Sequence, residues 1–114
     1  MRYSTASEPA SIRPRACDCS YCTLQGALYV SDPSGWLELA SGAHKYRQGE
    51  ERADFLSCPR CAVLLAVVYA GRGAVNARCL ECFGDFGRPM VVSPAKLKAE
   101  EKLERWQAHW TPLS

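Results

Sequence analysis

Cys17-Asp18-Cys19-Ser20-Tyr21-Cys22 is the stretch that decides the fold of this 114-residue chain. A regular strand or helix would direct its three closely spaced thiols to different sides. We therefore predict a tight knuckle that brings the three sulfurs to one point. Three thiolates at one point form a zinc site in which one of the four positions is open for a ligand. Two other readings stay open, namely three unconnected thiols or a strained local disulfide.

The composition of the chain indicates a single globular domain that stays in the cytoplasm. Hydrophobic residues make up 47% and charged residues 23% of the sequence, which is typical of soluble proteins. The net charge of +2 is too small to indicate a nucleic-acid or membrane partner. No apolar run reaches the ~18 residues of a membrane span, and we expect no secretory signal. Seven cysteines in that compartment favour metal binding over disulfides.

The pattern along the chain predicts a mainly β fold. Short strand-like segments alternate with turn signals such as residues 32–35. The unbroken apolar run 62–69 reads as a buried strand, and 74–80 as its hairpin partner across a turn at 71–73. Residues 46–50 read as a polar connection. The other expected strands are 2–5, 27–30, 36–39, 52–56 and 91–92.

The C-terminal segment 93–114 differs from the β domain 1–92 because its apolar residues follow a helical period. Ser93 is a suitable N-cap with Pro94 at the first helical position. The stripe that follows consists of Ala95, Ala99, Leu103, Trp106 and Trp110. Such a stripe predicts an amphipathic helix that packs on its own sheet. A homodimer contact is the alternative, because tryptophans are good interface anchors; the chain is thus expected to be a monomer or a homodimer.

Several motifs, in the same order, resemble the family of glutathione-dependent formaldehyde-activating enzymes, which also contains centromere protein V. The first is the Cys17–Cys22 segment followed by Gly26-Ala27-Leu28. The second is Tyr46 with Gly49, and the third is Phe55 ahead of Cys58-Pro59-Arg60-Cys61. The fourth is Val75-Asn76-Ala77-Arg78-Cys79-Leu80. Together they cover the chain up to about Met90.

The resemblance implies an Mss4-like fold of small antiparallel sheets with zinc knuckles, here followed by the C-terminal helix. It also implies that Cys17, Cys19 and Cys22 hold a zinc ion at the active site. The reaction of the family is reversible addition of the glutathione thiol to formaldehyde, which is carbon–sulfur lyase chemistry. A small thiol such as glutathione and an aldehyde would then be the partners of this protein.

A second, structural zinc in that family is held by a Cys-x-Cys-Gly segment near the N-terminus together with the Cys58–Cys61 knuckle. This chain has no cysteine before Cys17 and carries Ala62 where the family has glycine. Either the chain begins just past the missing motif, or the second site is lost or rebuilt. A rebuilt site would combine Cys58 and Cys61 with Cys79 and Cys82, whose spacing fits a zinc ribbon. The alternative is that Cys79 and Cys82 are ordinary thiols.

Thiol addition to an aldehyde needs a thiolate nucleophile, which a zinc ion at the three cysteines would favour. Glutathione carries two carboxylates, so we expect a basic side chain nearby: Arg78 first, then Arg60 or Lys45. Tyr46 is a candidate hydrogen-bond donor, and the isolated His44 and His109 suggest no catalytic role. Two other functions stay open: a non-catalytic zinc-stabilised β module that binds a protein, and a thiol or metal buffer.

Overall fold

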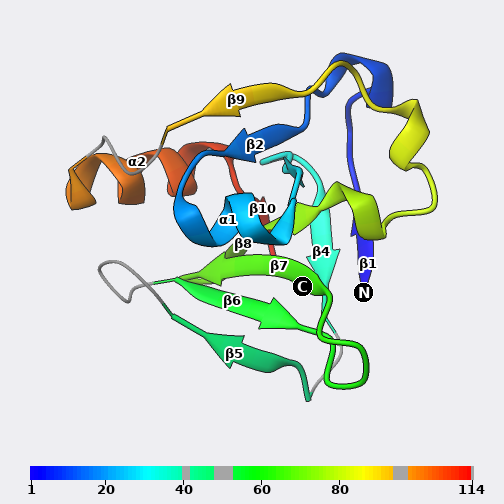
Figure 1. Cartoon of the computed structure of the whole chain (residues 1–114). Coiled ribbons are helices and arrows are strands. Elements are labelled where there is room, and N and C mark those ends of the chain that lie inside the picture. Colours follow the sequence, from blue (N-terminus) through cyan, green and yellow to red (C-terminus); the bar gives the residue numbers. More distant parts are fainter. Residues whose placement is uncertain (40–41, 48–52, 94–97, 114) are drawn as a thin grey trace.

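The computed structural model describes residues 1–39, 42–47, 53–93 and 98–113, and within them the chain is mainly β with a C-terminal helix (Figure 1). The strands are β1 (Arg2–Ser4), β2 (Arg15–Cys17), β3 (Tyr29–Val30), β4 (Trp36–Glu38), β5 (His44–Tyr46), β6 (Asp54–Ser57), β7 (Leu64–Tyr69), β8 (Arg72–Asn76), β9 (Met90–Val92) and β10 (Thr111–Pro112). The α-helices are α1 (Ser20–Gln25) and α2 (Ala99–His109). Three single-turn 3-10 helices are η1 (Pro9–Ser11), η2 (Ala77–Cys79) and η3 (Phe83–Asp85).

The strands form one large and one small sheet. The large sheet has the order β5-β6-β7-β8-β3-β2-β9, and β10 pairs with the start of β8. The small sheet consists of β1 and β4. Pairing between the strands is antiparallel except for β2 and β9, which run parallel at one edge of the large sheet (Figure 1). The prediction of a mainly β fold followed by a C-terminal helix is therefore confirmed, with one parallel pair that the sequence did not indicate.

The unbroken apolar run of β7 is explained by burial on both faces of the large sheet. Successive side chains of a strand point to opposite faces. Accordingly, Val67 lies in a core cluster that also contains Cys22, whereas Ala66 lies in a second cluster with Leu37 of the small sheet. The same division separates Ala74 from Val75 on β8. A strand covered on both faces needs apolar residues at every position, which is the pattern in the sequence.

The β7–β8 hairpin turns earlier than the sequence suggests. Tyr69 pairs with Arg72, so the turn is Ala70–Gly71 and not residues 71–73. Both turn residues have positive φ, 50° and 79°, as in the type I′ turns that match the twist of paired strands. The partner strand also ends sooner than predicted, at Asn76, because the Asn76 side chain accepts the N–H of Arg78 and begins η2.

Replacing Ala70 with asparagine is expected to raise the free energy of unfolding by about 0.5–1 kcal/mol, because asparagine tolerates the left-handed region better than other residues with a Cβ. Denaturant unfolding of the two proteins measures the change. Valine at the same exposed position is expected to lower the stability instead, because its branched Cβ opposes positive φ. Equal midpoints for the asparagine and alanine proteins would contradict this account of the turn.

Two other predicted elements differ in their bounds. Residues 46–50 were expected to be a connection, but His44–Tyr46 forms the edge strand β5, paired with β6. Residues 48–52, including Gly49, lie outside the described residues. The helix α2 begins at Ala99, with Lys98 at its N-cap. The Ser93 hydroxyl donates to the Asp18 carboxylate at 2.5 Å, and the predicted first helical residues, Pro94 and Ala95, lie outside the described residues.

The tryptophans of the C-terminal segment pack into the core of their own chain. Trp110 is buried and stacks on the half-buried Trp106, with ring centroids 4.7 Å apart. Trp106 also meets the edge of Tyr69 on β7. After the helix, β10 extends the large sheet, and the Thr111 hydroxyl accepts the N–H of Asp32 at 2.8 Å. Within the described ranges, neither helix has the length and apolarity that crossing a membrane requires.

Candidate metal centre

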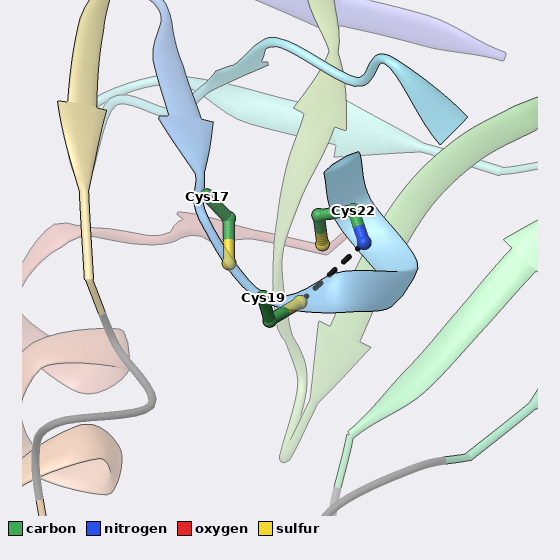
Figure 2. A group of neighbouring side chains, drawn as sticks. All are labelled: Cys17, Cys19 and Cys22. Carbon is green, nitrogen blue, oxygen red and sulfur yellow. Dashed lines mark hydrogen bonds between the residues drawn. The ribbon is translucent and has the colours of Figure 1, made fainter. Parts of the chain in front are cut away.

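The three cysteines of the N-terminal cluster converge where β2 passes into α1. Cys17 is the last residue of β2, Cys19 is the N-cap of α1, and Cys22 lies in its first turn. Their sulfur atoms lie within 4.8 Å of one another (Figure 2). The predicted convergence of the three thiols is correct, but its structural cause differs. A strand-to-helix junction, and not an isolated knuckle, brings the thiols together. A group of this kind can hold a metal ion.

Local backbone geometry fixes this junction. The Cys22 N–H donates to the Cys19 sulfur at 3.4 Å, the dashed line in Figure 2. The cysteine thus takes the place of the serine or aspartate that usually caps a helix. At the other end Gly26 adopts a left-handed conformation, φ 64°, and its N–H bonds the Cys22 carbonyl. The short helix therefore turns directly back into β3.

The buried Tyr29 of β3 completes the surroundings of the cluster. Its hydroxyl oxygen lies 3.1 Å from the Cys22 sulfur. Burial raises the pKa of Tyr29, and the neighbouring Cys22 raises it further. Tyr29 is not among the site residues predicted from the sequence. The sequence does contain a signal for such a role. Tyr29 lies in an otherwise apolar predicted strand, and a buried phenol generally requires a hydrogen-bond partner.

The thiols of the cluster differ in acidity because one donates to another. The hydrogen bond from the Cys22 thiol, together with the N–H of Cys19, lowers the pKa of Cys17 to about 6. The bond to Cys17, followed by burial, raises the pKa of Cys22. Of these two thiols in the metal-free protein, Cys17 is accordingly the one that ionises first. One preformed thiolate at neutral pH favours metal capture, since only thiolates bind metal ions strongly.

The second cysteine motif forms a well-defined turn between β6 and β7. The Cys58 N–H donates to the Val63 carbonyl at 2.9 Å, and the Ala62 N–H donates to the Cys58 carbonyl at 2.8 Å. Ala62 has φ 63°, so it holds the left-handed conformation that glycine adopts more easily. The N–H groups of Cys61 and Arg60 lower the pKa of Cys58. The backbone thus retains a turn that presents two thiols.

The four cysteines of the suggested rebuilt site do not form a compact group. Cys79 lies on η2, where its thiol donates to the Leu64 carbonyl at 3.3 Å; burial and then the nearby Cys61 raise its pKa. Cys82 is exposed beyond η2. Among the described residues, Cys17, Cys19 and Cys22 form a close group of metal-ligating side chains, whereas Cys58, Cys61, Cys79 and Cys82 do not. No disulfide links any of the seven cysteines, all of which lie in the described part of the chain.

Arg78, the first choice for binding a substrate carboxylate, is held in place by other contacts. Its Nε donates to the Gly26 carbonyl at 2.8 Å, and its guanidinium lies over the Phe83 ring at 5.5 Å. It therefore supports the end of α1, and a role in substrate binding stays a prediction. Asn76, from the same motif, is buried and connects two backbone segments. Its side-chain oxygen accepts the Leu28 N–H, and its side-chain amide donates to the Leu64 carbonyl.

A cavity of about 620 Å³ lies between α1 and β5. Tyr21 and Gln25 line it from α1, and His44, Lys45 and Tyr46 line it from β5. The ring of Tyr21 contacts those of Tyr46 and Phe55, with centroids 5.0 and 4.9 Å apart. Two residues of the family-like motifs, Tyr46 and Phe55, thus meet beside a residue of the cysteine segment. The cavity also contains a basic side chain, Lys45.

Comparisons with known proteins give one informative similarity. No protein-family model and no curated protein matches the chain. Among solved structures, the crystal structure of a Rhodobacter sphaeroides protein from a structural genomics programme is similar, with a TM-score of 0.50 and 23% sequence identity. The match covers 68% of this chain and 75% of the other. At this identity the similarity shows a shared fold and nothing of function.

Proposed function

We propose that this protein is a zinc-dependent carbon–sulfur lyase of the formaldehyde-activating type, acting on a small thiol such as glutathione and an aldehyde in the cytoplasm. The observation that carries the proposal is the convergence of the Cys17, Cys19 and Cys22 sulfurs within 4.8 Å. Three ligands from the protein leave one tetrahedral position for a substrate, which is typical of catalytic and not structural zinc sites. The family resemblance of the motifs, with Tyr46 and Phe55 beside Tyr21, supports the same reading.

The residues present fit a zinc ion. Three thiol donors form a soft ligand set, which favours zinc over magnesium or calcium. Cys17 is already acidic in the absence of metal, and the buried Cys22 sulfur shares a hydrogen bond with the Tyr29 hydroxyl, in which either group can donate. Zinc bound by these residues would lower the pKa of a thiol that enters the fourth position. The three cysteines would hold the ion, and the rigid β2–α1 junction would fix their positions.

The reaction requires only a thiolate and an aldehyde. The thiol loses its proton, its sulfur forms a bond to the carbonyl carbon, and the carbonyl oxygen takes up a proton to give a hydroxymethyl thioether. The reverse reaction breaks the same carbon–sulfur bond. Because three thiolates reduce the Lewis acidity of a metal ion, we favour delivery of the thiol over strong polarisation of the carbonyl. We propose that Lys45, which lines the cavity beside α1, attracts a carboxylate of the thiol substrate.

NMR exchange spectroscopy of glutathione and formaldehyde tests this function. The spontaneous reaction sets the baseline, and zinc-loaded protein is expected to accelerate the exchange at least about tenfold, which corresponds to about 1.4 kcal/mol of barrier. Protein stripped with a chelator is the control and is expected to give the baseline rate. Equal rates with loaded and stripped protein would reject the lyase and leave a zinc-stabilised binding module or a thiol buffer.

A further inference from the structure

Tyr29 is a buried side chain with a polar hydroxyl beside the candidate metal centre, and the proposed reaction does not use it. Its side chain is 6% exposed, and its hydroxyl lies 3.1 Å from the sulfur of Cys22, which is 3% exposed. The strand β3 directs Tyr29 into the cluster that contains Cys22, while the next residue, Val30, faces the opposite cluster. Backbone pairing with Arg15 and Asn76 on both sides fixes this direction.

The direction of this hydrogen bond is decided by metal binding. In the metal-free protein either group can donate, and the phenol is the donor whenever the Cys22 thiol donates to Cys17. Once Cys22 binds a metal ion its sulfur has lost its proton, so that only the Tyr29 hydroxyl can donate. A hydrogen bond to a charged acceptor is about twice as strong as one between neutral groups. In this buried setting the bond is also little weakened by water.

We propose that Tyr29 is a positioning residue of the metal centre, whose hydroxyl donates to the Cys22 thiolate, orients it and draws charge from its sulfur. Three thiolates give a divalent ion a surplus of negative charge. Donors to the sulfurs reduce that surplus, and each of two ligands has one: the Cys22 N–H for Cys19, and the Tyr29 hydroxyl for Cys22. The inference rests on the proposed metal centre, but not on the lyase reaction.

Tyr29→Phe in the full chain tests the inference, with cobalt as a coloured substitute for zinc. Loss of the hydrogen bond raises the energy of the sulfur lone pairs, so the sulfur-to-cobalt charge-transfer band is expected to shift to longer wavelength. Cobalt and zinc affinities, measured by competition with a chelator, are expected to fall by about 10–100-fold, the usual effect of losing a partner of a metal ligand. Neither readout depends on catalysis.

Tyr69→Phe is the matched control, because Tyr69 packs against the same core cluster and the substitution also removes a tyrosine hydroxyl. It is expected to leave the cobalt band and the affinity unchanged. An unchanged band and affinity in Tyr29→Phe would overturn the proposal and leave Tyr29 a packing residue. If wild-type protein binds no metal at all, the metal centre itself is wrong, which is a separate result.

A second measurement needs no variant. In wild-type protein loaded with an NMR-active cadmium isotope, the Tyr29 hydroxyl proton is expected to show a scalar coupling to the metal across its bond to Cys22. A slowly exchanging hydroxyl proton with such a coupling supports the proposal even if Tyr29→Phe does not fold. A tyrosine hydroxyl that exchanges freely with water in the cadmium-loaded protein would overturn it.

Discussion

Cys19→Ser is expected to remove the metal ion while keeping the fold. The cysteine has two roles, since its sulfur belongs to the three-thiol group and also accepts the Cys22 N–H at the start of α1. Serine is a preferred N-cap, so it preserves the second role and removes only the thiolate. Metal affinity is expected to fall more than about 100-fold, because losing only a residue that hydrogen-bonds a metal ligand already lowers the affinity about 10–100-fold. The acceleration of thiol addition to formaldehyde is expected to disappear with the metal.

Metal analysis after dialysis against a weak chelator measures this effect, with about one zinc ion per chain expected for the wild type if the three-cysteine centre alone is occupied. Cys82→Ser is the control, because Cys82 is exposed, lies outside the three-thiol group and makes no side-chain capping bond. Two results would contradict the assignment of Cys19 as a zinc ligand. One is a full zinc ion per chain in Cys19→Ser, and the other is faster thiol addition to formaldehyde by protein that contains no zinc. A wild-type content near two ions would indicate that the Cys58–Cys61 turn also binds metal.

Trp110→Ala is expected to lower the free energy of unfolding by about 3–5 kcal/mol, as for other buried aromatic residues cut back to alanine. Trp110 is 8% exposed, stacks on Trp106 and belongs to the same core cluster as Cys22 and Tyr29. Its removal would leave a large cavity between the end of α2 and β8. This loss is a large fraction of the free energy of unfolding of a typical domain, which is about 5–15 kcal/mol.

Denaturant unfolding followed by circular dichroism measures the change, and Trp36→Ala is the matched control. Trp36 is 42% exposed on β4, so the same substitution there is expected to cost no more than about 1 kcal/mol. Similar losses for the two tryptophans would show that α2 does not pack on the domain in solution. That result would favour the alternative in which the tryptophan stripe contacts a second chain.

Local patterns were sufficient for much of the fold. The apolar run ending at Tyr69 predicted a buried strand, and the turn at residues 32–35 was correct, since the Gly35 N–H bonds the Asp32 carbonyl. Element bounds were less accurate where a side chain acts on the backbone. The start of η2 depends on the Asn76 side chain, and Ser93 bonds Asp18, far away in the sequence. The contact between Ser93 and Asp18 has no local signature, whereas an asparagine N-cap such as Asn76 has one.

The spacing of Cys17, Cys19 and Cys22 by itself predicted the ligand set, because a tight turn of so short a segment can direct all three sulfurs to one point. Only the tertiary structure decided what surrounds them. Tyr29 reaches the Cys22 sulfur because Gly26 reverses the chain and β3 is held between β2 and β8. Tertiary contacts likewise hold Arg78 against Gly26 and Phe83. A short-range pattern can specify a ligand set, but hydrogen-bond partners from other strands depend on sheet order and register, which long-range packing selects.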